Sequence, residues 1–235
     1  MNSNAASVKS RAILLDGMPQ PHTFTPAERR VIKTYRTPLD VQRWLNRLPY
    51  NAEPHGATQR SFREVVRLHT AHCMEGALAA AVILEQHGYP PRVMSLESID
   101  QLDHVIYVYQ RNGLWGSIAR SRDPGLHGRK PVFRTARALA LSYVDPYVDF
   151  TGGVKAYGVV DLRELMGRYD WRLSPRNLWK VEQALIDLPH RPIKSSKARI
   201  ERLRAKYRAF VERHGKKPLF YRGRERWTPL PKGAW

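Results

Sequence analysis

The sequence predicts an α+β fold in which an apolar helix packs on a small antiparallel sheet. An apolar run over residues 73–84 is typical of a buried helix, and Pro90-Pro91 prevents its continuation. Residues 92–96 are expected to form one strand, and residues 105–109, which are β-branched or aromatic, a second. Asn112-Gly113 favours a two-residue hairpin turn, so the chain is expected to return antiparallel as far as about residue 121.

Helices are expected on both sides of this core. Thr25-Pro26 and Thr37-Pro38 each place a capping hydroxyl before a proline, which is tolerated at the first helical position. Ser174-Pro175 repeats the pattern farther along the chain. A further helix is expected over about residues 135–143, and another where apolar side chains recur at helical spacing between residues 200 and 211.

These elements predict three segments: an N-terminal helical segment (1–54), a core (55–165) and a helical, strongly basic C-terminal extension (166–235). The 235 residues, 42% of them hydrophobic, suffice to bury a core. No apolar run approaches the roughly 20 residues of a membrane span, and the stretch 12–15 is too short for a signal peptide. The single cysteine excludes an internal disulfide framework and a multi-thiolate zinc site, so a reducing cytoplasm is the expected location.

The net charge of +19 predicts an affinity for anionic partners. From His190 to the end, fifteen Lys and Arg residues face three Glu residues, a local excess of +12. A nucleic acid or another polyanion is therefore a candidate partner of the C-terminal extension. A basic nucleic-acid-binding module is the alternative to an enzyme.

The chemistry is expected to centre on Cys73, which lies close to the start of the apolar helix. Free amide groups at a helix N-terminus stabilise a thiolate, which is the nucleophilic form. Strand alternation puts His104 on one face with Ile106, so the imidazole meets the thiol if that face packs on the helix. Two alternatives stand beside this hypothesis. Cys73 can be a small buried apolar residue, and a helix that ran from 58–69 on through Thr70 would leave the thiol in mid-helix.

The hairpin register predicts what orients the imidazole. A two-residue turn pairs Arg111 with Leu114 and, counting outward, His104 with Ser121, whose Cβ atoms would lie about 5 Å apart. Ser121 is therefore the default orienting group. Asp123 is its rival if a bulge or bend ends the ladder early.

The order of these residues resembles a known superfamily. Cys73-x-x-Gly-Ala at the helix start precedes Gly88-Tyr-Pro-Pro-Arg-Val, then Asp103-His104-Val, then Gly113-Leu-Trp115-Gly. Over about residues 68–121 this order is similar to the core of transglutaminase-like, papain-type cysteine enzymes, and also to arylamine N-acetyltransferases, which share the architecture and a Cys-His-Asp triad. The aspartate of the transglutaminase-like triad falls at or near Ala119 here, which leaves Ser121 or Asp123 in its place.

The resemblance implies acyl chemistry. His104 takes the thiol proton, the Cys73 thiolate attacks an amide or ester carbonyl, and backbone amides near Cys73 stabilise the oxyanion. Water as acceptor makes a peptidase or amidohydrolase, and an amine makes an acyltransferase. This chemistry needs no cofactor or metal, although His69, His72 and Cys73 share a helical face and are an alternative ligand set. A catalytically inactive transglutaminase-like scaffold is a further alternative.

Overall fold

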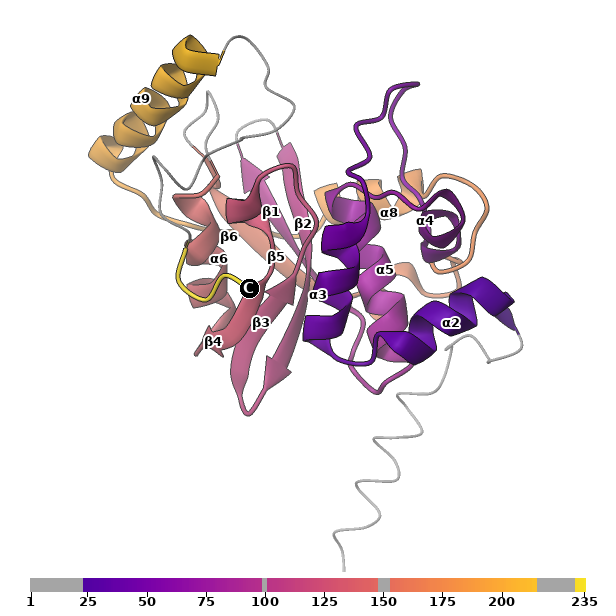
Figure 1. The fold of residues 1–235 in the computed structure, drawn as a ribbon. Coiled ribbons are helices and arrows are strands. Elements are labelled where there is room, and N and C mark those ends of the chain that lie inside the picture. Colours follow the sequence, from indigo (N-terminus) through magenta and orange to yellow (C-terminus); the bar gives the residue numbers. More distant parts are fainter. Residues whose placement is uncertain (1–22, 99–100, 148–152, 215–230) are drawn as a thin grey trace, which may run out of the picture.

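A six-stranded antiparallel sheet with helices on both faces organises the molecule (Figure 1). The computed structural model describes residues 23–98, 101–147, 153–214 and 231–235. The strands run in the order β4 (Arg129–Phe133), β3 (Leu114–Ile118), β2 (Gln101–Arg111), β1 (Arg92–Ser98), β5 (Ala156–Asp161) and β6 (Arg191–Pro192). The chain is thus mixed α+β, as its sequence predicts.

One helix, α5 (Cys73–Glu85), packs directly on the sheet and is itself surrounded by other helices (Figure 1). Those on the same side are α2 (Pro26–Thr34), α3 (Pro38–Arg47), α4 (Phe62–Leu68) and α8 (Trp179–Ile186). The opposite face is covered by α6 (Ala136–Val144), and α9 (Lys197–His214) lies farther out beyond it. The short α7 (Leu162–Met166) follows β5 directly. No helix in the described ranges is long and apolar enough to cross a membrane.

The two faces of the sheet bury two separate apolar clusters. Val93 and Tyr107 point to the α5 side, whereas Ile106 and Val108 pack with Leu139 on the α6 side. The condition under which strand alternation alone would bring the imidazole to the thiol, that the Ile106 face packs on the cysteine helix, is therefore not met. By strand alternation His104 belongs to the same face as Ile106, so its contact with the thiol depends on an irregularity in the pairing of β2 with β1.

The local helix signals are largely confirmed. Thr25 and Thr37 both form capping boxes, with Glu28 and Asp40 as the returning carboxylates. The prediction of a helix start at Ser174-Pro175 is wrong, because α8 begins only at Trp179 and the Ser174 hydroxyl accepts a hydrogen bond within its own turn, from Arg176 N.

The hairpin register is confirmed, since Arg111 pairs with Leu114 and Tyr107 with Ile118. The returning strand is shorter than expected and ends at Ile118, so the ladder stops three residues before Ser121. β4, β5 and β6 are strands that the sequence analysis did not identify. The predicted C-terminal helix is present as α9, which docks through buried Leu203 and Phe210.

Candidate active site

The thiol of Cys73 lies at the very start of α5, not in the middle of a longer helix. The preceding helix α4 ends at Leu68, and His69 adopts a left-handed conformation with φ 54°. Ala71 then pairs with Tyr50 in an isolated parallel bridge, and Cys73 is the first helical residue. The alternative of one helix running through Thr70 is thus wrong. Amides in this first turn have no carbonyl one turn earlier to bind, so they favour a negative charge on the sulfur.

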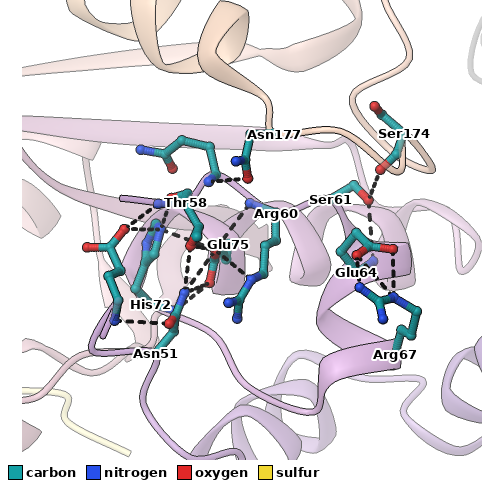
Figure 2. Close-up of polar contacts among 12 residues, drawn as sticks. Asn51, Thr58, Arg60, Ser61, Glu64, Arg67, His72, Glu75, Ser174 and Asn177 are labelled. Carbon is teal, nitrogen blue, oxygen red and sulfur yellow. Dashed lines mark hydrogen bonds and ion pairs between the residues drawn. The ribbon is translucent and has the colours of Figure 1, made fainter. Parts of the chain in front are cut away.

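Buried Glu75 holds this helix start in place (Figure 2). Its carboxylate accepts from the backbone amide of His72 at 3.0 Å, which closes the end of the helix. It also accepts from Asn51 Nδ2 at 3.0 Å, from the Thr58 hydroxyl at 2.8 Å and from the Arg60 amide at 3.2 Å. One carboxylate therefore ties the 51–60 loop to the turn that presents the cysteine.

Two imidazoles bind the half-buried thiol. Burial by itself raises the pKa of Cys73, but hydrogen bonds from His104 and His72 and the positive charges of both rings lower it. Together they hold the pKa well below the ordinary thiol value, so the structure favours a thiolate at neutral pH.

His72 is the residue that the sequence analysis missed as a thiol partner. Burial lowers its pKa, but the hydrogen bond to Cys73, the negative charges of Cys73 and Glu75, and the Thr58 carbonyl raise it to about 9. Its Nε2–H donates to Thr58 O at 2.8 Å and lies 3.4 Å from Glu75 Oε1. At neutral pH His72 is therefore an imidazolium beside a thiolate. The signal was present in the sequence, because Glu75 stands three residues after His72 in the spacing of a capping box.

His104 reaches the same thiol from β2. A bulge in the pairing of β1 with β2 falls between Leu96, opposite His104, and the next pair. Bulges turn side chains away from strict alternation, which accounts for a ring that contacts the thiol while sharing the parity of the α6 face. The centroid of the His104 ring lies 5.9 Å from the centroid of the Tyr143 ring on α6.

A backbone carbonyl occupies the orienting position. His104 Nε2 donates to the buried Leu126 carbonyl at 2.9 Å, which leaves Nδ1 for the thiol. The Ser121 hydroxyl accepts from Asp123 N at 3.1 Å, and Asp123 Oδ1 accepts from Gly125 N at 2.8 Å. These contacts place both expected orienting residues in the loop that carries Leu126. The Ser121 and Asp123 contacts help to shape that loop, whereas the partner of His104 Nε2 is the Leu126 carbonyl.

Arg129 braces the same loop from β4. This fully buried guanidinium donates to the carbonyls of Gly125, His127 and Gly128, on both sides of Leu126. Burial and the charges of nearby cations lower the pKa of His127 to about 4, although its bond to the Ser121 carbonyl raises it, so this third imidazole is neutral. The loop behind His104 thus has a fixed shape and no ionised histidine of its own.

The alternative metal set does not assemble. Among the described residues no three His, Cys, Asp or Glu side chains converge as ligands, and His69 is exposed at the end of α4. What converges instead is one nucleophile, two imidazoles and the free amides of a helix start. Comparison of the sequence with protein-family models and with curated proteins found no match.

Proposed function

We propose that the protein is a cysteine-dependent enzyme of acyl chemistry, acting on an amide or ester, with Cys73 as nucleophile and His104 as the proton-transfer group. The observation that carries the proposal is a thiol at the first residue of a helix, with His72 next to it in the chain, and interactions with His104 and His72 lower its pKa. The papain-type, transglutaminase-like interpretation of residues 55–165 is part of the same proposal. It is supported by the order of cysteine helix, antiparallel strand and histidine.

The steps follow from the positions of the groups. The thiol proton resides on an imidazole, and the Cys73 thiolate forms a bond to the substrate carbonyl carbon while the first amides of α5 bind the oxyanion. The tetrahedral species collapses, and the imidazolium of His104 gives its proton to the departing amine or alcohol. Water or an amine then attacks the thioester, loses a proton to His104 and releases Cys73.

The two imidazoles divide the work in this proposal. His72 is bound to the Thr58 carbonyl and lies beside Glu75, so it remains protonated and stabilises the thiolate. His104 donates to a neutral carbonyl, that of Leu126, and moves the proton. A carbonyl fixes the ring orientation as an aspartate does, but it supplies no full negative charge to stabilise the imidazolium.

An acyl-enzyme trap tests the function. With p-nitrophenyl acetate we expect a burst of p-nitrophenolate and one acetyl group on intact protein by mass spectrometry. Cys73→Ser should show neither, and His104→Asn should slow both. Decay of the acetylated species in water, compared with decay in added hydroxylamine, distinguishes a hydrolase from an acyltransferase. An acetyl group found on Cys73→Ser to the same extent would contradict the proposal.

A second candidate function, polyanion binding, is favoured by the surface of α9. Buried Leu203 anchors this helix, and four of its basic side chains are exposed: Lys197, Arg202, Arg208 and Arg213. A labelled single-stranded RNA should bind with an affinity that falls steeply with salt. The double variant Arg202→Glu/Arg208→Glu should flatten that dependence, whereas Cys73→Ser should leave it unchanged. Equal salt slopes for the double variant and the wild type would exclude α9 as the binding surface.

A further inference from the structure

Two arginines meet over one aromatic ring beside the candidate active site. The guanidinium carbon of Arg120 lies 5.5 Å from the Tyr50 ring centroid, and that of Arg122 lies 5.7 Å from it. Arg120 is 9% exposed, whereas Arg122 is open to solvent. One cation is thus fixed inside the protein and the other stands at the surface next to it.

The chain places this cluster against the first turn of α5. Tyr50 pairs with Ala71, two residues before the nucleophile, and the neighbouring Asn51 N donates to Ala71 O at 3.1 Å. On the other side, a Cβ built on Gly76 would lie 2.9 Å from Arg120 Cβ, so the arginine segment contacts the helix one turn after the nucleophile. The Tyr50 phenol also interacts with the charges of the site. Burial, the Cys73 thiolate and a nearby carboxylate raise its pKa, and both guanidinium groups lower it.

Neither cation has a carboxylate partner in the described part of the chain. Arg120 donates to the carbonyls of Leu48 at 3.0 Å and Ser121 at 2.6 Å, and its buried Nε has no acceptor among the residues that the structure describes. Arg122 takes part in no ion pair among the described residues. A buried charge without a counter-ion is unfavourable, so an anion bound from solution would stabilise Arg120.

Two carboxylates of the surrounding loops make other contacts. Glu53 accepts from the Thr58 amide at 2.7 Å and lies 3.8 Å from His72 Nε2. Asp123 Oδ1 accepts from Gly125 N in the loop behind His104. No ion pair among the described residues includes Arg120 or Arg122, so an external anion can bind beside Tyr50.

We propose that Arg120 and Arg122 form an anion subsite beside Cys73, so that the acyl substrate carries a carboxylate or phosphate close to its reacting carbonyl. The inference rests on the proposed function of Cys73 and names the substrate class for it. Arg122 supplies exposed donors that bind the anion directly, and the enclosed charge of Arg120 strengthens the field behind it. The net charge of +19 steers such substrates toward the protein.

Two alkylating reagents of nearly the same shape test the subsite without a known substrate. Iodoacetate carries a carboxylate and iodoacetamide a neutral amide, and the chain has one cysteine to label. Both react with the same thiolate, so the ratio of their rates cancels the ionised fraction and reports the local field. We expect this ratio to be higher in the folded protein than in urea.

The variants give the sign and size of the effect. An exposed charge acting through water changes the rate of a charged reagent by a few-fold, so Arg122→Gln should lower the iodoacetate to iodoacetamide ratio by about threefold. Arg122→Glu should lower it about tenfold. Arg111→Gln is the matched control, because it lies seven residues along β2 from His104, about 23 Å away, and should keep the wild-type ratio.

The outcomes separate this inference from the proposed function. A ratio equal to that of the wild type in both Arg122 variants overturns the anion subsite, even if the thiol is activated. An iodoacetamide profile that still titrates near the ordinary thiol pKa overturns the activated thiol, whatever the ratio. If glutarate but not inorganic phosphate protects Cys73 from iodoacetamide, and Arg122→Gln loses this protection, the anion is a carboxylate. If phosphate but not glutarate protects it, the anion is a phosphate. Protection by neither compound overturns the subsite.

Discussion

His72→Gln should raise the pKa of Cys73, because the structure makes this imidazolium one of the two partners of the thiolate. The pKa of His72 rises from 6.5 to about 9, and the causes that raise it are led by the hydrogen bond to Cys73. A shift of that size corresponds to about 3 kcal/mol in favour of the charged ring. Interaction energies are reciprocal, so what the thiolate gives the imidazolium it also receives.

Part of that energy belongs to Glu75 and Thr58, which also favour the charged ring. We therefore expect the variant to raise the Cys73 pKa by about one to two units. The assay is the pseudo-first-order rate of iodoacetamide labelling between pH 4 and 10, with loss of free thiol as the readout. His55→Gln removes an exposed imidazole of the same loop and should keep the wild-type midpoint.

A second readout follows from the sign of the shift. Because the folded-state pKa of His72 is raised, its contribution to stability is complete below the unfolded-state value near 6.5 and is lost as pH rises through about 9. The difference in urea unfolding free energy between wild type and His72→Gln should shrink across that window. A labelling midpoint within 0.3 units of wild type, together with a stability difference that does not change with pH, would refute the reasoning.

Three further changes have expected outcomes. Glu75→Gln should cost about 2–4 kcal/mol in urea unfolding, because the amide cannot accept all the donors that meet the buried carboxylate; a loss under 1 kcal/mol would contradict its role. The folded-state pKa of His127 is depressed to about 4, so the wild type should lose up to about 3 kcal/mol of unfolding free energy as pH falls from 6.5 to 4. His127→Gln should abolish this loss. The same loss of stability in the variant would argue against a buried neutral ring. Gly76→Ala should be destabilising by about 1 kcal/mol in thermal or urea unfolding, because a Cβ placed 2.9 Å from Arg120 Cβ outweighs the better helix propensity; stabilisation would show that the arginine segment moves freely.

The elements that could be predicted are those whose signals are local. Thr25 and Thr37 define helix starts through atoms three residues away, and Asn112-Gly113 sets the pairing of its own hairpin. In each case the stabilising partner lies within one turn of structure. Composition near that point therefore carries enough information.

Long-range contacts overrode a local signal at the start of α8. Leu178 N donates to Gln59 O at 2.7 Å, and Asn177 Oδ1 accepts from Gln59 N at 3.0 Å. These bonds hold the segment after Ser174 to a loop more than a hundred residues earlier, and they delay the helix to Trp179. β5 escaped prediction for a related reason, because its place between β1 and β6 depends on partners distant in sequence.

In the candidate site, Cys73 and His104 could be predicted from the sequence because their side chains have characteristic chemistry. The group that orients His104 could not. That group is a main-chain carbonyl, which every residue type possesses, so Leu126 carries no signal of its role. Its position is encoded by its neighbours. Arg129 binds the carbonyls on either side, and a Cβ on Gly128 would lie 2.4 Å from Ser117 O, so only glycine lets the loop approach β3. Replacement of the Leu126 side chain should thus disturb the imidazole less than a change at Arg129 or Gly128, because the orienting function resides in residues other than the one that makes the contact.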